Sequence, residues 1–288
     1  MTRPGPLGEA AARLAAAGVA SPEHDARLLL AHVLRVPHLR VDGCPELAGA
    51  QAEAFADLVD RRARREPLQH LIGTAAFRYV EVEVGPGVFV PRPETELLAG
   101  WAIARATALL TAGVEQPIVV DLGTGSGAIA KAIADEQPQA RVYAVELSDA
   151  ALAYAGRNLA GTGVELRAGD LAESLPELDG RVDVVLANPP YIPLSEYESV
   201  AVEARDHDPA IALWSGTDGH DAIRTVERTA RRLLRPGGVV GCEHADSQGE
   251  SVPALFAARP EWVDVRDHRD LADRPRFTTA RRRESPAR

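Results

Sequence analysis

Cysteine is scarce in this 288-residue sequence, and lysine is scarcer still. The two cysteines, Cys44 and Cys242, lie far apart and lack the spacing of metal ligands. We therefore expect two reduced thiols in a cytoplasmic protein, with neither a disulfide nor a metal site. Lys131 is the single lysine among 32 basic residues, a bias that we attribute to a GC-rich genome.

The sequence also lacks a long apolar run and an excess of basic charge. No stretch approaches the ~20 consecutive apolar residues that cross a bilayer, so no membrane association is expected. The net charge is −10, and residues 1–85 carry 10 basic and 11 acidic side chains, so nearly all of the negative charge lies beyond them. Because phosphate neutralisation needs the opposite balance, we expect no direct binding of nucleic acid.

Residues 1–72 have the periodicity of helices. Ser21 is a candidate N-cap, and Pro22 is a candidate first residue of a helix. Apolar side chains then recur at helical spacing, here and again over residues 45–67. The side chains expected to face the core are Ala26, Leu29, Leu30, Val33, Leu34, Leu47, Phe55 and Leu58. This part is predicted to form a small helical domain.

The remainder of the chain is rich in short strands. We expect a β-hairpin linker over residues 73–93, because valines alternate with glutamates before a turn signal at Gly85-Pro86-Gly87. Residues 94–288 then alternate apolar strands with amphipathic helices, which is typical of an α/β fold with a mainly parallel sheet covered on both faces. Residues 280–288 are expected to form a solvated tail.

A glycine-rich loop joins a predicted strand to a predicted helix. Gly123, Gly125 and Gly127 permit positive φ and a close approach of N–H groups to a ligand. Gly123, Gly125 and Ala128 also satisfy the dinucleotide-binding fingerprint. Glu146 ends the next predicted strand, where a carboxylate accepts hydrogen bonds from ribose hydroxyls. NAD and S-adenosylmethionine both carry such a ribose, so these residues leave both cofactors open.

Further polar residues at predicted strand ends favour S-adenosylmethionine. Asp121 would repel a pyrophosphate but attract the ammonium and sulfonium groups of this cofactor, although it also suits a turn. Asp170 is placed either to accept a hydrogen bond from the adenine amino group or to cap the next helix. Asn188 follows a fourth strand. Because ligands bind beyond the carboxyl ends of such strands, we expect one shared pocket.

The fourth strand stops at Asn188-Pro189-Pro190-Tyr191. The Asn188 side-chain oxygen and the Pro189 carbonyl are two acceptors for one planar NH₂ group, and the prolines stiffen the backbone without adding donors. Two fixed acceptors would orient a nitrogen lone pair toward an incoming methyl group, and Tyr191 offers a flat face to the target. A rigid surface turn is the alternative interpretation.

These motifs resemble those of the class I S-adenosylmethionine-dependent methyltransferases. Within this class the chain is similar to the protein-(glutamine-N5) methyltransferases that act on peptide-chain release factors. The similarity covers nearly the whole length, through "PLQHLIG", "FVPRPETE", "DLGTGSGAIA", "NPPYIP", "EHADSQGE" and "DRPRF". It implies a seven-stranded Rossmann-like methyltransferase sheet over residues 94–288 and a substrate-docking role for the helical domain, residues 1–72.

The resemblance also implies roles for individual residues. The implied cofactor-binding residues are Asp121, Gly123, Thr124, Gly125, Ser126, Gly127, Glu146, Asp170, Leu171 and Asn188. The implied catalytic residues are Asn188, Pro189, Pro190 and Tyr191. The target would be the glutamine of the release factor's Gly-Gly-Gln motif, which would modulate translation termination. Aspartate is the more usual residue in this family at the position of Glu146.

Other functions remain as alternatives to release-factor methylation. They are glutamine methylation in a ribosomal protein, adenine-N6 methylation in DNA and non-catalytic binding of S-adenosylmethionine. The acidic charge of the catalytic part weighs against DNA as substrate, since such an enzyme must grip a duplex and extrude a base. We expect Asp206, His207 and Asp208 to lie in a solvated loop and to bind no metal. No role follows from the sequence for Glu243 or Gln248.

Overall fold

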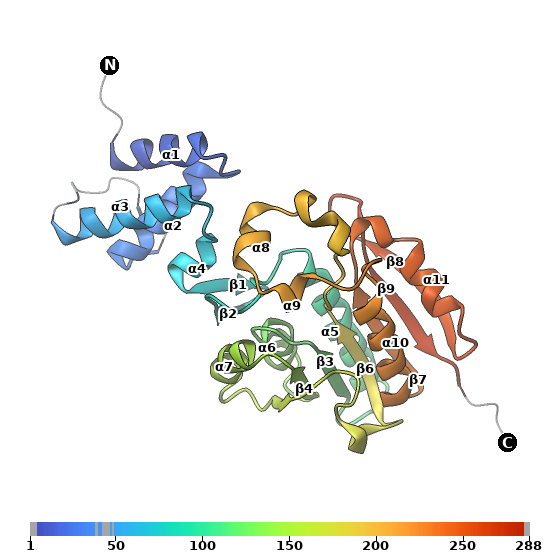
Figure 1. Ribbon diagram of the computed structural model, residues 1–288. Coiled ribbons are helices and arrows are strands. Elements are labelled where there is room, and N and C mark those ends of the chain that lie inside the picture. Colours follow the sequence, from blue (N-terminus) through green and yellow to red (C-terminus); the bar gives the residue numbers. More distant parts are fainter. Residues whose placement is uncertain (1–4, 38–39, 42–46, 48, 285–288) are drawn as a thin grey trace. The chain divides into compact units, whose positions relative to one another are not determined.

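The computed structural model describes residues 5–37, 40–41, 47 and 49–284, and the chain forms two compact units (Figure 1). The helical unit comprises Met1–Thr74 together with Ala201–His207. The larger α/β unit comprises Ala75–Val200 and Asp208–Arg288. The sequence did not indicate that a short segment beyond residue 200 packs with the N-terminal helices.

The helical unit contains α1 (Pro6–Ala16), α2 (Pro22–Leu34), α3 (Ala50–Ala63), α4 (Leu68–Ile72) and α8 (Val202–His207). Ser21 is the N-cap of α2, as predicted, although its side chain makes no capping hydrogen bond. Each apolar residue expected in the core is buried or packs against the core. Glu203 of α8 joins this unit through ion pairs with Arg62 and Arg65 of 3.2 and 2.7 Å.

The predicted hairpin is formed by β1 (Thr74–Phe77) and β2 (Val80–Glu83), which make a separate two-stranded sheet. Its turn is Arg78-Tyr79, with Arg78 at a φ of +52°. The expectation that the hairpin turns at Gly85-Pro86-Gly87 was wrong. The glycines follow β2 instead of separating two strands, and Val84, Val88 and Val90 around them are buried in the core of the α/β unit.

The main sheet has seven strands in the order β5-β4-β3-β6-β7-β9-β8. The strands are β3 (Ile118–Leu122), β4 (Arg141–Glu146), β5 (Glu165–Ala168), β6 (Val182–Ala187), β7 (Leu234–Glu243), β8 (Trp262–Arg269) and β9 (Pro275–Arg282). The first five of these pair in parallel, and β9 runs antiparallel to both β7 and β8. The predicted α/β class with a mainly parallel, seven-stranded sheet is confirmed.

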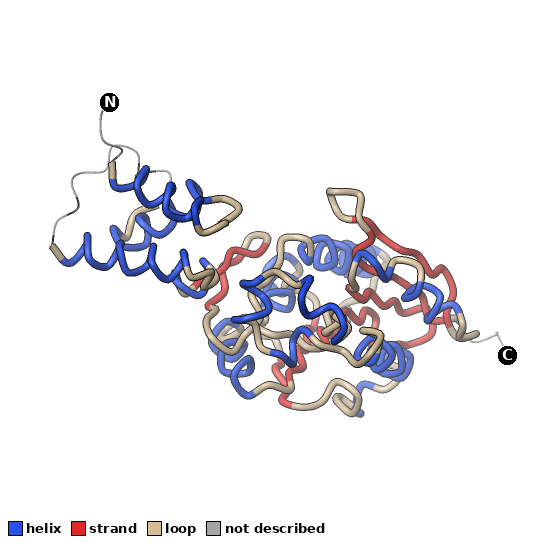
Figure 2. Tube along the Cα trace, turned by 45° about the horizontal axis from the view of Figure 1, so that its top comes forward, coloured by secondary structure: helices blue, strands red, loops and turns tan. Residues whose placement is uncertain are grey.

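Helices cover both faces of this sheet, whose strands are red in Figure 2. The helices are α5 (Thr95–Thr111), α6 (Ala128–Glu136), α7 (Asp149–Asn158), α10 (Asp221–Leu233) and α11 (Ser251–Ala257). The first three share a core with Val119 of β3, whereas α10 and α11 share a core with the next residue, Val120. Since successive strand side chains point to opposite faces, α5–α7 and α10–α11 lie on opposite sides.

The segment between β6 and α10 contains the 3-10 turn η3 (Leu194–Ser199), α8 and the short helix α9 (Ala210–Leu213). Two further 3-10 turns are η2 (Pro176–Leu178) and η4 (Asp246–Gln248). None of the helices within the described ranges combines the length and the apolar character that a membrane span needs. Cys242 is buried and unpaired, while Cys44 lies outside the described residues.

The C-terminal residues correct a second expectation. Residues 280–282 are the end of β9, and Ala280 is 2% exposed where it pairs with Val240 of β7. The predicted solvated tail over residues 280–288 was therefore wrong in its first part, and residues 285–288 lie outside the described structure. Arg281 and Arg282, two of the arginines that suggested a tail, belong to this strand, and Arg283 follows it.

Candidate active site

The carboxyl ends of the central strands bring the predicted polar residues to one edge of the sheet. Leu122 at the end of β3 is in register with Val145 of β4 and with Ala187 of β6. The strand order reverses between β3 and β6, so the glycine loop after β3 and Asn188 after β6 flank the switch point. Open α/β sheets bind their ligands at such a point.

The glycine loop turns through three residues at positive φ, which is +74° at Gly123, +58° at Gly125 and +84° at Gly127. A Cβ atom at Gly127 would lie 3.0 Å from Cγ of Leu159, so the close packing of α6 also requires glycine there. The N–H groups of Gly123 and Thr124 both donate to the Val145 carbonyl at 2.9 Å. The loop is thus held by β4, and α6 begins directly after it.

Asn158, which the sequence did not single out, fastens the loop from α7. Its Nδ2 donates to the carbonyl of Ser126 at 2.8 Å and to the carbonyl of Glu83 at 2.9 Å. Its Oδ1 accepts the N–H of Glu83 at 2.7 Å. One buried amide therefore joins the loop to the end of β2. No local signal reveals this, because Asn158 and Glu83 are 75 positions apart in the chain.

Asp121 is fully buried at the end of β3. The Thr124 hydroxyl donates to its Oδ2 at 2.6 Å, while Oδ1 has no hydrogen-bond donor among the described residues. Burial raises the pKa of Asp121 from 3.8 to about 7, the Thr124 hydrogen bond opposes that rise, and the nearby Glu146 carboxylate adds to it. A cation beside these two carboxylates would favour the ionised form of Asp121.

Glu146 is the last residue of β4, and backbone N–H groups fix its carboxylate. Gly125 donates to Oε2 at 2.8 Å, and Leu147 and Ser148 donate to Oε1 at 2.9 and 2.8 Å. A carboxylate has about four acceptor positions, so one remains for a ribose hydroxyl. The same side chain that would bind ribose therefore also orients the glycine loop.

Asp170 and Leu171 follow β5, the next strand beyond β4. Asp170 is exposed, and its Oδ1 accepts the N–H of Ala172 at 2.8 Å in a turn. No helix begins at this turn, so the helix-capping alternative does not apply. Leu171 packs against the core shared by α10 and α11. Both residues lie at the same edge of the sheet as Glu146, since Ala168 pairs with Glu146 in register.

Asn188 follows β6 directly and is partly buried. Its Nδ2 donates to the hydroxyl of Thr95, the first residue of α5, at 3.2 Å. Its Oδ1 and the carbonyl of the buried Pro189 accept no hydrogen bond from any residue that the structure describes. The loop thus presents two oxygen acceptors whose partners are not supplied by the described protein.

The backbone beyond Pro190 is braced by the segment that precedes α10. Ile192 donates its N–H to the Leu213 carbonyl at 3.0 Å and accepts the N–H of Ser215 at 2.9 Å. Gln248 donates through Nε2 to the carbonyl of Tyr191 at 3.1 Å. Sequence analysis left Gln248 without a role, and the structure places it as a support of this loop.

Glu243 ends β7 beneath the same loop and is 1% exposed. The hydroxyl of Tyr191 lies 3.5 Å from its Oε1, at the upper limit for a hydrogen bond. Burial raises the pKa of Glu243 from 4.5 to about 7, and a hydrogen bond from the Thr95 hydroxyl and the charge of Arg276 oppose that rise. Burial likewise raises the pKa of Tyr191.

The residues considered for a metal are divided between the two units, with Asp206 and His207 in the helical unit and Asp208 in the α/β unit. His207 ends α8, and Asp208 is buried with its Oδ2 2.6 Å from a guanidinium nitrogen of Arg92. The expected solvated loop over residues 206–208 was therefore wrong. In the described parts of the chain, no three His, Cys, Asp or Glu side chains gather in a way that would hold a metal ion.

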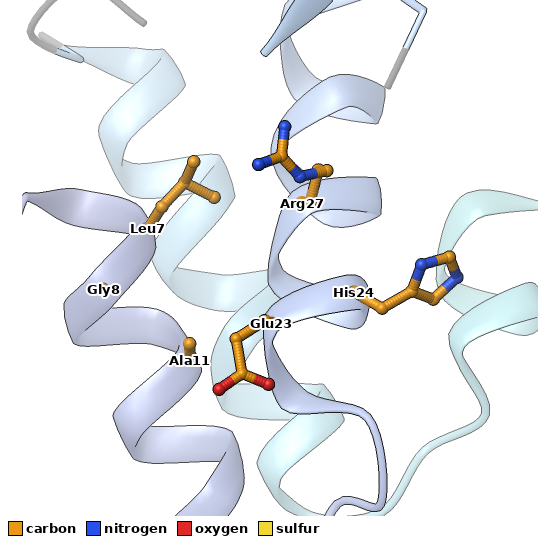
Figure 3. A pocket seen from close by; sticks show the side chains of 6 residues that line it. All are labelled: Leu7, Gly8, Ala11, Glu23, His24 and Arg27. Carbon is orange, nitrogen blue, oxygen red and sulfur yellow. The ribbon is translucent and has the colours of Figure 1, made fainter. Parts of the chain in front are cut away.

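The helical unit has a shallow hollow of about 280 Å³ between α1 and α2 (Figure 3). Its lining residues are Leu7, Gly8, Ala11, Glu23, His24 and Arg27. None of the residues predicted to bind cofactor or substrate lines this hollow. We therefore place the candidate active site at the strand ends of the α/β unit.

Comparison with known families identifies both parts of the chain. Residues 7–73 match the model described as the PrmC N-terminal domain, and residues 119–207 match a methyltransferase domain. The first match lies in the helical unit. The second runs from β3 to α8 and contains the glycine loop, Glu146 and Asn188.

Curated relatives match over nearly the whole length. A release factor glutamine methyltransferase of Streptomyces coelicolor is 55% identical and covers 96% of both chains. One of Mycolicibacterium smegmatis is 49% identical, with 95% of both chains covered. A 4-amino-L-phenylalanine/4-methylamino-L-phenylalanine methyltransferase of Streptomyces pristinaespiralis is 46% identical, and the match covers 89% of this chain and 87% of that one.

Proposed function

The chain belongs to the release factor glutamine methyltransferases, and we propose that it methylates the side-chain amide nitrogen of a release-factor glutamine, with S-adenosylmethionine as methyl donor. The family resemblance assigns this target to the glutamine of the Gly-Gly-Gln motif. The helical domain, residues 1–72, would dock the release factor, and residues 73–93 would link it to the methyltransferase domain, residues 94–288.

The observation that supports this reaction most directly is the pair of unused acceptors at Asn188 Oδ1 and the Pro189 carbonyl. A primary amide has two N–H donors, and two acceptors at the end of one strand can take both. With both N–H bonds directed to fixed oxygens, the nitrogen lone pair is left facing the methyl donor. Such preorganisation lowers the barrier because no reorganisation is needed during the reaction.

Bound S-adenosylmethionine would supply an electrophilic methyl group on a sulfonium. The amide nitrogen forms the new N–C bond, the C–S electron pair stays with sulfur, and one N–H proton leaves to water. Asn188 and Pro189 direct the nitrogen, and polarisation of its N–H bonds raises its electron density as the bond forms. Tyr191 offers a ring face against the planar amide. The proposed reaction needs no metal.

The residues at the strand ends fit this co-substrate. Asp121 has a buried oxygen without a donor in the described structure, which is where a positive group would be stabilised. Glu146 retains acceptor capacity for a ribose hydroxyl, and a Cβ atom built at Gly123 or Gly125 would meet no atom of the described protein within 4 Å, so the loop leaves room for a ligand. Asp170 and Leu171 would contact the adenine. A pair of carboxylates suits a sulfonium and an ammonium better than a pyrophosphate.

Mass spectrometry of a release factor after incubation with the protein and S-adenosylmethionine tests the proposal. One added methyl group on the Gly-Gly-Gln glutamine is the expected result, and a release factor with alanine in place of that glutamine is the control. No methylation of the intact factor, or methylation only of a ribosomal protein or of DNA, would refute it.

A second candidate substrate is a small aromatic amine. The relative from Streptomyces pristinaespiralis is named for activity on 4-amino-L-phenylalanine, and its 46% identity covers most of this chain. An aryl NH₂ group presents the same two donors to Asn188 and Pro189 as an amide does. A reaction that contains equal amounts of 4-amino-L-phenylalanine and release factor would show which substrate is methylated faster. We expect the added methyl group on the release factor.

A further inference from the structure

The side chain of Gln248 is buried where three segments of the α/β unit meet. It is 4% exposed and belongs to η4, the turn that follows β7. Its Nε2 donates to the carbonyls of Tyr191 at 3.1 Å and of Gly219 at 3.4 Å, and its Oε1 accepts the N–H of Ala245 at 3.0 Å. One amide therefore joins the loop of residues 188–191 to the turn after β7 and to the residues that precede α10.

The direction of the Gln248 amide follows from the polarity of its partners. All three are backbone groups, and a peptide carbonyl can only accept a hydrogen bond while a peptide N–H can only donate one. If the amide were turned over, its oxygen would face two carbonyls and its NH₂ group would face the N–H of Ala245. The observed direction is therefore the one that satisfies this buried side chain.

The carbonyl of Tyr191 is closely packed from a second side. Gly219 has a φ of +75°, and a Cβ atom there would lie 2.3 Å from this carbonyl oxygen and 2.7 Å from Nε2 of Gln248. Position 219 therefore requires glycine, both for its backbone conformation and for this close approach. Gly219 and Gln248 thus confine the Tyr191 carbonyl from two different segments.

The loop of residues 188–191 has few groups of its own by which the fold could hold it. Pro189 and Pro190 lack N–H groups, so neither can donate a backbone hydrogen bond. The carbonyl of Pro189 is one of the two acceptors proposed for the substrate, so it is not available as an anchor. The two proline rings fix φ, and the segment therefore transmits the position of its far end back to Asn188.

That far end is the peptide group between Tyr191 and Ile192, which is held at both of its polar atoms. Gln248 donates to its carbonyl at 3.1 Å, and its N–H donates to the carbonyl of Leu213 at 3.0 Å. Two hydrogen bonds on opposite sides oppose rotation of this peptide plane. Loss of the Gln248 bond would leave the plane held from one side.

We propose that Gln248 is a positioning residue for methyl transfer, which acts through the Tyr191 carbonyl to fix the direction in which Asn188 and Pro189 present their acceptors. The inference rests on the proposed function of these two acceptors. Gln248 is assigned no contact with the substrate, with S-adenosylmethionine or with the reacting methyl group.

Steady-state kinetics of full-length variants with a release factor test this inference. Gln248→Met keeps the length of the side chain but removes all of its hydrogen bonds. We expect it to lower kcat roughly 10- to 100-fold, because a small displacement of positioning groups has an effect of this size. Calorimetric affinity for S-adenosylmethionine should stay within about twofold of wild type, which also shows that the variant is folded.

Gln248→Glu provides a readout that a merely structural role would not move. An ionised carboxylate would face two carbonyls without a proton to donate, whereas a protonated carboxyl could again donate to Tyr191. Because burial raises the pKa of a carboxyl group, we expect kcat of Gln248→Glu, divided by the wild-type value at the same pH, to rise several-fold from pH 8.5 to pH 6. The same ratio for Gln248→Met should not change with pH.

Other groups that titrate near Gln248 are shared by all variants. They lie on the three segments that meet there and on β9, which packs against η4. Dividing by the wild-type value at each pH cancels their titration. These groups are Tyr191, Asp218, His220, Glu243, His244, Asp246 and Arg276.

A matched control and a double-mutant cycle complete the experiment. Gln139 is exposed in the loop before β4, at the opposite ends of the strands, so Gln139→Glu should keep wild-type kcat at every pH. If Gln248 acts through the loop of residues 188–191, adding Gln248→Met to Asn188→Ala should lower kcat by less than it does in the wild-type background.

Several outcomes would overturn the inference. They are wild-type kcat in Gln248→Met, a pH-independent ratio for Gln248→Glu, and losses that simply multiply in the double variant. Weakened binding of S-adenosylmethionine in Gln248→Met would also overturn it, since the effect would then extend beyond the loop. Absence of glutamine methylation by the wild-type protein would instead refute the proposed function, and the inference with it.

Discussion

Replacing Asp121 with asparagine should stabilise the ligand-free protein against unfolding. It should also weaken the binding of S-adenosylmethionine. Burial removes this carboxyl from water and thereby raises its pKa from 3.8 to about 7, and the charge of Glu146 adds to the rise. A rise of that size corresponds to ~4 kcal/mol of cost for ionising Asp121 in the folded protein. Asparagine keeps the acceptor for the Thr124 hydroxyl but carries no charge.

The sign of the pH dependence follows from proton binding. Between about pH 4 and pH 7 the folded protein holds a proton on Asp121 that the unfolded chain has lost, so the stability of the ligand-free protein falls as the pH rises through this window. Above about pH 7 the full cost is present. At pH 8 we expect Asp121→Asn to raise Tm by a few degrees, since ~4 kcal/mol of ionisation cost is removed while burial of the new NH₂ group costs ~1–3 kcal/mol.

Binding of the co-substrate should show the opposite linkage. If a positive group on the ligand stabilises ionised Asp121, wild-type affinity should increase by nearly tenfold from pH 6 to pH 7.5, as a pKa of about 7 dictates. Asp121→Asn should bind more weakly at pH 7.5, and its affinity should change much less over this interval. Comparing the two proteins cancels the titration of Glu243 and of the ligand.

Calorimetric titration and thermal unfolding across this pH range provide the measurements. Asp135→Asn, an exposed change on α6, is the matched control and should alter neither Tm nor affinity. The reasoning would be refuted if Asp121→Asn lowered Tm at pH 8. It would equally be refuted if the variant bound S-adenosylmethionine as tightly as the wild type at pH 7.5.

Three further substitutions test other parts of the site. Asn188→Ala should leave affinity for S-adenosylmethionine within about twofold and lower turnover by roughly 10²- to 10³-fold, the loss typical of one preorganised polar contact; wild-type turnover would show that the amide is held elsewhere. Glu146→Ala should weaken co-substrate binding in calorimetry, because it removes a ribose acceptor and frees the N–H of Gly125 that shapes the loop; unchanged affinity would remove the ribose assignment. Gly127→Ala should lower the free energy of unfolding by ~1–3 kcal/mol in urea titrations, because φ is +84° and the new Cβ lies 3.0 Å from Leu159 Cγ; an unaffected midpoint would contradict the packing argument.

The class of the fold and much of the candidate site follow from local patterns in the sequence. Alternating strands and helices predict a parallel sheet, and such a sheet places the carboxyl ends of its strands at one edge. Asp121, Glu146 and Asn188 each lie at the end of an apolar run or directly after it. Their place at this edge therefore follows from the alternation of strands and helices along the sequence. Family motifs then indicate which ligand suits them.

The antiparallel strands at the other end of the sheet could not be predicted from local sequence patterns. Residues 277–280 form the buried part of β9, yet two of the four are threonines, and the segment has no alternation of apolar and polar side chains. Their burial arises because β9 pairs with both β7 and β8. The position of the hairpin turn was not predictable from local sequence either. Arg78-Tyr79, where the chain turns, has no turn signature, whereas Gly85-Pro86-Gly87, which follows the hairpin, has a strong one.

The sequence by itself determined the fold class, the order of the elements and the strand-end residues, because these depend on short-range periodicity and on backbone chemistry. Only the tertiary structure decided which groups stand behind those residues. Thr95 and Asn188 are 93 positions apart, and Glu243 approaches Tyr191 across 52 positions. Hydrogen bonds between such distant residues depend on strand order and helix packing, which no local pattern encodes.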